Sequence, residues 1–134
     1  MSAITYTANA RASLISGHVA GTDYTFEIKA RAHDRGRNIR SSQVSALSGT
    51  LETTLEGIDG VLSLTLGSVA DGAEMDQVYE WFDSVAGGEI FLFDLNGTAS
   101  QQDNPIALIL TSNKLSERRV GVNNFIFSIQ CRRT

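Results

Sequence analysis

One stretch of this chain, residues 71–95, constrains the fold most, because it predicts a helix that leads directly into a strand. The helix is expected at about residues 72–86, where apolar side chains recur at helical spacing on one face, at Met75, Val78, Phe82 and Val85. The other face carries four acids and is expected to face solvent: Glu74, Asp76, Glu80 and Asp83. This pattern predicts a helix that lies against β-structure.

Both ends of this helix carry sequence signals. Asp71 and Glu74 have the D-x-x-E spacing of a capping box, in which each side chain accepts a hydrogen bond from the backbone amide near the other. Gly87-Gly88 predicts a left-handed stop. Trp81 lies beside the apolar stripe, and we interpret it as a core residue, with contact to a partner protein as the alternative.

The rest of the chain predicts β-structure. Alternating or continuous apolar residues indicate strands at residues 24–31, 39–47, 61–66, 89–95, 106–111 and 119–132. In the last of these strands, four residues are expected to face the core: Phe125, Phe127, Ile129 and Cys131. About six strands and one helix favour a mainly β fold, an antiparallel β-barrel or β-sandwich with one lateral α-helix, built as a single domain over residues 1–134.

Composition and motifs argue against catalysis. His18 and His33 stand apart from any Cys or carboxylate at metal-ligand spacing, and the sequence has no catalytic or phosphate-binding motif. The single cysteine, Cys131, is interpreted as a small core residue. We therefore expect an assembly or binding protein rather than an enzyme, with no cofactor, metal or catalytic residue. The lack of a signal peptide or of an apolar run of membrane length predicts a protein of the cytoplasm, or one released from it by lysis.

Charges are segregated along the chain. Residues 41–113 hold eleven acids and no Lys or Arg, whereas the remaining residues hold all eleven Lys and Arg and four acids. The first part therefore carries a charge of −11 and the second +7, which gives the net charge of −4. A molecule with an acidic and a basic side can associate head to tail, the kind of contact that closes into rings, unless folding interleaves the two parts.

Residues 31–40 form the most basic segment. We interpret it as a solvated loop or hairpin tip, or as an ion-pairing contact between subunits. Nucleic-acid binding is a weaker hypothesis, because no aromatic residues interleave with the arginines and the pI is about 5.0. The candidate subunit interface pairs this segment with the acidic helix face of the next copy, through Arg35, Arg37, Arg40, Glu80 and Asp83.

Residues from about 60 to 134 resemble the barrel domain shared by distal tail proteins and small minor tail proteins, which form the tail-tip hub of long-tailed bacteriophages. The resemblance rests on an aromatic-bearing helix that ends in glycines, an F-x-F strand, a polar loop with proline, and a last strand with alternating aromatics. The matching positions are Val78, Trp81, Phe82, Gly87, Gly88, Phe91, Phe93, Pro105, residues 106–111, Phe125, Phe127 and Ile129.

This resemblance implies a structural virion protein. It would form a homo-oligomeric, hexameric ring at the distal end of the tail and join the tail tube protein to the baseplate hub or fibre proteins. Its expected location is the tail tip of the virion, and the host cytoplasm before assembly. No membrane contact and no specific nucleic-acid binding are implied, even if DNA passes through the lumen of the ring. Two alternatives stay open: another ring-forming tail component, such as a tube or terminator protein, and a small cytoplasmic β-barrel that binds an apolar ligand.

Overall fold

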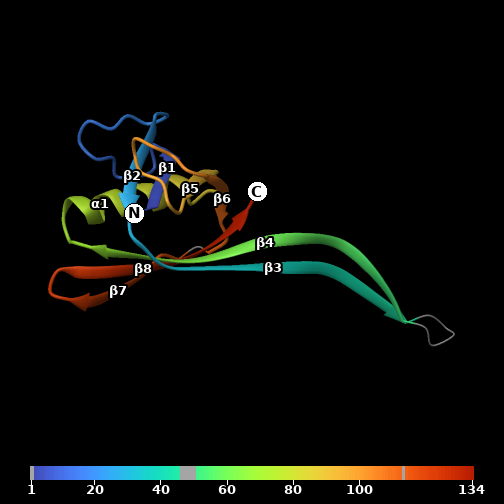
Figure 1. Cartoon of the computed structure of the whole chain (residues 1–134). Coiled ribbons are helices and arrows are strands. Elements are labelled where there is room, and N and C mark those ends of the chain that lie inside the picture. The colour runs from blue at the N-terminus through green and yellow to red at the C-terminus, as the bar shows by residue number, and fades with distance from the viewer. Residues whose placement is uncertain (1, 46–50, 113) are drawn as a thin grey trace.

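The computed structural model describes residues 2–45, 51–112 and 114–134; for residues 32–35, 38–45 and 51–59 it describes the backbone. Within these residues eight strands and one helix follow in chain order: β1 (Ser2–Thr7), β2 (Asp23–Ile28), β3 (Ala30–Ser45), β4 (Leu51–Val69), α1 (Ala73–Val85), β5 (Phe91–Asp94), β6 (Ile106–Leu110), β7 (Ser116–Gly121) and β8 (Asn124–Arg133). Figure 1 shows a rounded body from which β3 and β4 extend together as a long ribbon.

The strands form one antiparallel sheet in the order β2-β1-β5-β6-β8-β4-β3, with β7 beside β8. Its end strands β2 and β3 form no ladder with each other among the described residues, so the sheet curls without closing. One hydrogen bond bridges this region, from the Gly67 amide to the Lys29 carbonyl at 2.9 Å. The mainly β fold with one lateral helix is confirmed, whereas the barrel form is not observed because the sheet stays open.

Helix α1 and the curled sheet enclose one hydrophobic core. Met75, Val78, Trp81 and Val85 are the buried apolar residues of the helix. Trp81 is fully enclosed and meets Phe91 edge-on, with ring centroids 5.3 Å apart, which confirms that it is a core residue. Three of the four residues expected on the apolar face are therefore buried, Met75, Val78 and Val85, whereas Trp81 takes the fourth place and Phe82 is only half-buried. No helix in the described part of the chain is long and apolar enough to span a membrane.

The two helix ends differ in how well the sequence predicted them. The capping box is wrong: the N-cap is Gly72, without a side-chain capping bond. Asp71 instead accepts from the Gly72 amide at 3.0 Å, and Glu74 reaches back to the Ala70 amide at 2.9 Å. At the other end Gly88 has a φ of 91°, which confirms the left-handed stop.

Most of the predicted strands are confirmed, with shifted ends. Residues 24–31 form β2 and the start of β3, and residues 61–66 lie inside the longer β4. Residues 89–95 shorten to β5, and residues 106–111 become β6. The last predicted strand corresponds to the end of β7, a turn and β8. Three of the four residues expected to face the core from β8 are buried, Phe127, Ile129 and Cys131, and Phe125 is half-buried.

The largest error concerns residues 31–47. The sequence predicts a basic loop followed by a returning strand at residues 39–47. Residues 39–45 are a strand, but they continue the single strand β3, which includes the predicted loop, and the return strand is β4. Residues 46 and 47 lie outside the described residues. The ladder runs from Ala30 opposite Leu66 to Ser45 opposite Leu51. Asp34, Gly36 and Asn38 suggest a loop, because these residue types are depleted in strands.

Candidate subunit interface

The projecting ribbon, which we call the arm, consists of residues 37–45 of β3 and 51–60 of β4. Strand β8 pairs with β4 only as far out as Val61, so β3 is the sole partner that the described residues provide for β4 in the arm. Nine residues at about 3.3 Å each give the arm a length of about 30 Å. Figure 1 shows it leading away from the body. An isolated two-stranded ribbon is only marginally stable in water, so an arm of this kind needs a partner.

The register of the arm continues the core-facing side of the sheet. Leu62, Leu64 and Leu66 are at most 4% exposed, and they lie on one side of β4 inside the body. Strand alternation places positions 60 and 58 on the same side, and Ile58 lies opposite Ile39. After the register shift between Arg40 and Ser41, position 55 lies opposite position 41 and position 51 lies opposite position 45. Positions 55 and 51 therefore fall on this same side of the ribbon.

The side of the sheet that faces the core therefore carries apolar residues well beyond the core. The arm has four of them at these positions, Ile39, Leu51, Leu55 and Ile58, which share this side with the polar residues Ser41, Gln43, Ser45 and Thr53. The opposite side of the ribbon holds mostly polar or charged residues, such as Asn38, Ser42 and Thr54. In Figure 1 the arm projects beyond the described body. We call the side with the four apolar residues the apolar face of the arm.

The five candidate interface residues from the sequence do not lie together in one subunit. Arg35, Arg37 and Arg40 all belong to β3, and Arg37 is exposed. Asp83 is exposed on α1, as expected. Glu80 is the exception, because it is only 1% exposed, so its expected place on the solvent face of the helix is wrong. A carboxylate without exposed surface offers nothing to a neighbouring copy.

Glu80 is instead the centre of a buried polar cluster. It accepts hydrogen bonds from the Tyr6 hydroxyl and the Ile15 amide, both at 3.0 Å, and one of its oxygens lies 2.7 Å from His18 Nδ1. Gln77 in turn donates to the Tyr6 hydroxyl at 2.6 Å. Burial, and next the bond to Glu80, raise the pKa of Tyr6 well above its usual value, so this hydroxyl stays protonated and donates.

This cluster fastens the segment at residues 8–22, which we call the 8–22 loop, over the helix. The His18 ring stacks on Tyr24 with centroids 3.8 Å apart. At the helix C-terminus, Arg11 donates to the carbonyls of Asp83 and Ser84, each at 2.7 Å, as cations do at this end of a helix. Arg11 also bonds Glu89 at 2.5 Å and holds the pKa of that carboxyl below its usual value.

No local pattern in the sequence indicates this cluster. Glu80 and His18 are separated by 62 positions, and each has an unremarkable local context. His18 has no carboxylate at metal-ligand spacing along the chain, and only the fold brings Glu80 within 2.7 Å of its Nδ1 atom. No group of three or more His, Cys, Asp or Glu residues that could hold a metal ion occurs among the residues the structure describes.

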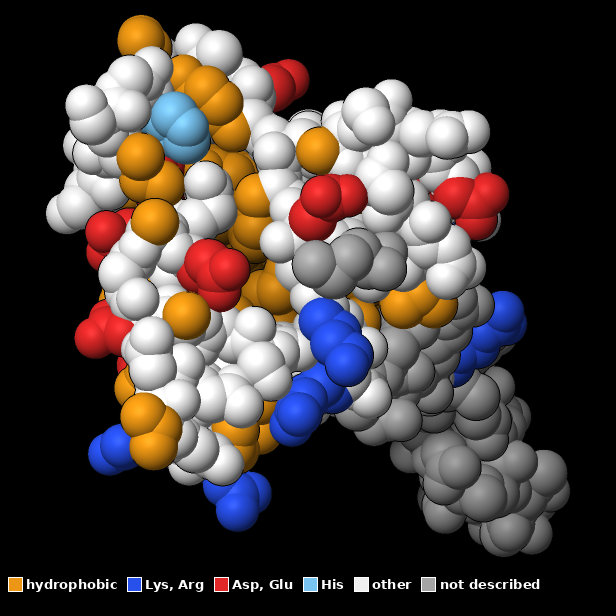
Figure 2. All heavy atoms as spheres, turned by 60° about the vertical axis from the view of Figure 1, so that its left-hand side comes forward, with side chains coloured by type: hydrophobic (Ala, Val, Ile, Leu, Met, Phe, Trp, Pro, Cys, Tyr) orange, Lys and Arg blue, Asp and Glu red, His pale blue; other side chains and the backbone are white. Residues whose placement is uncertain are grey.

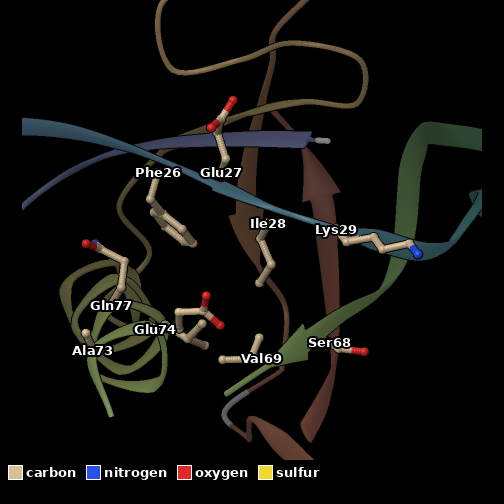
Figure 3. A pocket seen from close by; sticks show the side chains of 10 residues that line it. Phe26, Glu27, Ile28, Lys29, Ser68, Val69, Ala73, Glu74 and Gln77 are labelled. Atoms are coloured by element: carbon tan, nitrogen blue, oxygen red, sulfur yellow. The ribbon is translucent and has the colours of Figure 1, made fainter. Parts of the chain in front are cut away.

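A pocket of about 490 Å³ opens beside the first turns of α1; we call it the root pocket, after its place at the root of this helix. It lies between the first turns of α1, strand β2 and the end of β4, and its lining residues are Phe26, Glu27, Ile28, Lys29, Ser68, Val69, Ala73, Glu74, Gln77 and Val78. Figure 3 shows Phe26 and Ile28 pointing from β2 toward this space, whereas Glu27 points to the other side of the strand. In Figure 2, hydrophobic side chains likewise gather in a hollow between two parts of the body.

The surroundings of the root pocket are acidic on the helix side. Asp71, Glu74 and Asp76 are all exposed around the helix N-terminus, and of these Glu74 lines the pocket. Exposed Lys29 lines the opposite side, where the chain passes from β2 to β3. The site therefore combines an apolar floor of Val69 and Val78 with a charged rim, which suits a polypeptide that carries both apolar and basic residues.

Comparison with known proteins gives structural neighbours only. No protein-family model and no curated protein matches the chain. One similar structure is a chain from the "Virion of native gene transfer agent (GTA) particle", with a TM-score of 0.47, 15% identity and coverage of 84% of each chain. Another comes from the "Tail of empty GTA particle computed with helical refinement, C6 symmetry", with a TM-score of 0.49 and 13% identity over 98% of this chain and 89% of that one. Similarity this low carries no argument about function.

Proposed function

We propose that this protein is a structural subunit that assembles with copies of itself, and that the arm makes the main contact. One observation carries the proposal: the register continues the core-facing side of the sheet along the arm, where four positions are apolar, and the arm projects beyond the described body in Figure 1. Apolar surface of this kind on a protein usually marks an interface. A ribbon that is marginal alone becomes stable when another subunit covers it.

We further propose that the assembly is part of the tail of a long-tailed phage or a phage-like particle. The sequence resemblance of residues from about 60 to 134 supports this class. It favours a hexameric ring at the distal end of the tail, between the tail tube and the baseplate hub or fibre proteins. In this role the protein is not an enzyme and works through its surfaces.

The length of the arm favours a second candidate, a tube component in which rings stack. A body of about 110 residues has a radius of gyration of about 13 Å. An arm of about 30 Å therefore spans roughly the width of a neighbouring body. Such a reach suits a contact with a copy in the next ring as well as one within the same ring.

Charges would orient this contact. Basic residues Arg35, Arg37 and Arg40 of one copy remain the candidates for the basic side, and Asp83 remains a candidate on the acidic side of the next copy. Because Glu80 is buried, we replace it with the exposed acids at the helix N-terminus, Asp71, Glu74 and Asp76.

A shortened arm tests the proposal. Arg37 and Gly60 lie opposite each other, so an Asn-Gly turn in place of residues 38–59 closes the ribbon at the edge of the body. We expect this variant to keep a cooperative thermal transition and to sediment as a monomer at concentrations where the wild type is oligomeric. Assembly of the shortened variant to the wild-type size would refute the role of the arm. A wild type that stays monomeric at high concentration would refute self-assembly and favour the small barrel-like ligand binder.

A further inference from the structure

We infer that the root pocket receives the apolar face of the arm from a second copy of this chain. This inference rests on the proposed function and names the receiving surface for the arm. It depends on three properties of the described residues: what the arm needs, what the root pocket offers, and where the two lie in the molecule.

The arm and the root pocket match in chemistry. The arm presents aliphatic residues at core-facing positions and follows a basic stretch of β3 that includes exposed Arg37. The root pocket has an apolar floor that includes Val69 and Val78, and acids surround its helix side. Apolar burial beside charges of opposite sign is the arrangement expected of a specific protein contact.

The arm cannot fill the root pocket of its own subunit. The pocket lies at the other end of β3 and β4 from the arm, because Lys29 just before β3 and Ser68 and Val69 at the end of β4 line it, whereas the arm begins at Arg37 and Gly60. From Arg37 and Gly60 the arm leads outward, away from the pocket, as a paired antiparallel ribbon, as Figure 1 shows. The occupant must therefore be the arm of another copy.

This placement produces a head-to-tail chain of contacts. Each copy inserts its arm into the root pocket of the next copy, whose own arm projects from the opposite end of β3 and β4 and leads to a third copy. The two contacting surfaces are different, so the contact is heterologous, and repetition closes a ring or builds an open helix. The inference thus explains how one arm and one pocket per subunit suffice for the whole assembly.

The pocket side is tested by Ala73→Tyr, with Ala86→Tyr as the matched control. Ala73 is exposed and lines the root pocket, whereas Ala86 is exposed at the other end of the same helix and does not line it. We expect Ala73→Tyr to raise the concentration for half-assembly at least about tenfold, as loss of an anchoring contact does. The control should stay near the wild type. If Ala73→Tyr lowers the thermal midpoint markedly, Lys29→Trp fills the pocket from an exposed position outside the helix.

The arm side is tested by Leu55→Glu, with Thr54→Glu as the matched control. The two residues are adjacent, and the register puts Leu55 opposite Ser41 on the apolar face and Thr54 opposite Ser42 on the other side. Leu55→Glu should weaken assembly at least about tenfold, since a charge would enter an apolar contact. Thr54→Glu should assemble nearly as the wild type does.

Mixing the two blocked variants gives the decisive result. Ala73→Tyr keeps an intact arm and Leu55→Glu keeps an intact pocket, so an equal mixture can form one productive contact. We expect a species of two subunits in the mixture, measured by sedimentation at high concentration, and little association of either variant alone. Unimpaired assembly of both pocket variants, alongside loss of assembly in Leu55→Glu, would overturn the pocket inference while leaving the arm's role intact. Two blocked variants whose mixture forms no such species would also overturn it. If Leu55→Glu and the shortened arm both assemble normally, the proposed function fails as well.

Discussion

Replacement of Glu80 by Gln is the sharpest test of how the interior is held together. The substitution keeps the size of the side chain and removes its charge. Glu80 is 1% exposed and accepts from the Tyr6 hydroxyl and the Ile15 amide, and His18 Nδ1 lies 2.7 Å away. A carboxamide has a single acceptor oxygen, so it cannot serve partners on both sides of the carboxylate.

The expected loss follows from these contacts. Hydrogen bonds to a charged group contribute about 1.5–3 kcal/mol each, and neutral ones about 1 kcal/mol. In Glu80→Gln, the hydrogen bonds that remain become neutral ones, and at least one donor is left unpaired. Together these changes lower the free energy of unfolding by about 2–3 kcal/mol. For a chain of this length, that loss lowers the thermal midpoint by roughly 6–15 °C.

Thermal unfolding at neutral pH, followed by circular dichroism, measures the effect. Asp83→Asn is the control, since Asp83 is an exposed acid on the same helix and loses the same charge. An exposed substitution of this kind changes stability by no more than about 0.5 kcal/mol. Release of the 8–22 loop should also make the chain easier for trypsin to cleave after Arg11. If Glu80→Gln melts together with Asp83→Asn, the carboxylate does not organise the cluster and the reasoning fails.

Two further predictions concern the core and a surface hydrogen bond. Replacement of Phe93, which is 1% exposed, by Ala should lower the free energy of unfolding by about 3–5 kcal/mol, and the same replacement of half-buried Phe82 should lower it clearly less. Equilibrium unfolding in urea measures both losses, and equal losses would contradict the observed buried face of the helix. The bond of the Tyr79 hydroxyl to Glu117, with some burial, raises the pKa of Tyr79 from 10.0 to about 12. The stabilisation is therefore complete below pH 10 and is lost as the pH rises through about 12. Glu117→Gln should move the ultraviolet titration of this phenol to lower pH, with Tyr79→Phe to assign it, and an unchanged titration would contradict the bond.

Strand prediction succeeded where one side of a strand is buried. Phe127, Ile129 and Cys131 alternate with polar residues on β8, and a period of two is characteristic of a half-buried strand. The helix was also found within one residue of each end, because it combines a period of 3.6 with a glycine stop. Its buried stripe was harder to assign, since Trp81 and Phe82 are adjacent and both aromatic.

The features that matter for the proposed function were hidden for physical reasons. Local sequence places Glu80 among exposed acids, and only the distant 8–22 loop removes it from water. The arm was only half recognised: a strand was predicted at residues 39–47, but its pairing with residues 51–60 was not, because strand signals come from burial and the arm has no core of its own chain to pack against. Arg35-Gly36-Arg37 therefore suggested a turn, although Gly36 lies in mid-strand opposite Val61.

The sorting of the helix acids refines the role of charge in assembly. Four acids share one side of α1 in the sequence, yet Glu80 is used inside the subunit while Glu74, Asp76 and Asp83 stay exposed. Each exposed ion pair that these three could form with a neighbour's arginines is worth only about 0–1 kcal/mol. Charges of this size select an orientation and speed the encounter of subunits. The affinity must come from apolar burial, and the arm supplies the aliphatic residues for it while the root pocket supplies a surface beside the acids. For this reason charge reversal alone should weaken assembly less than Leu55→Glu does.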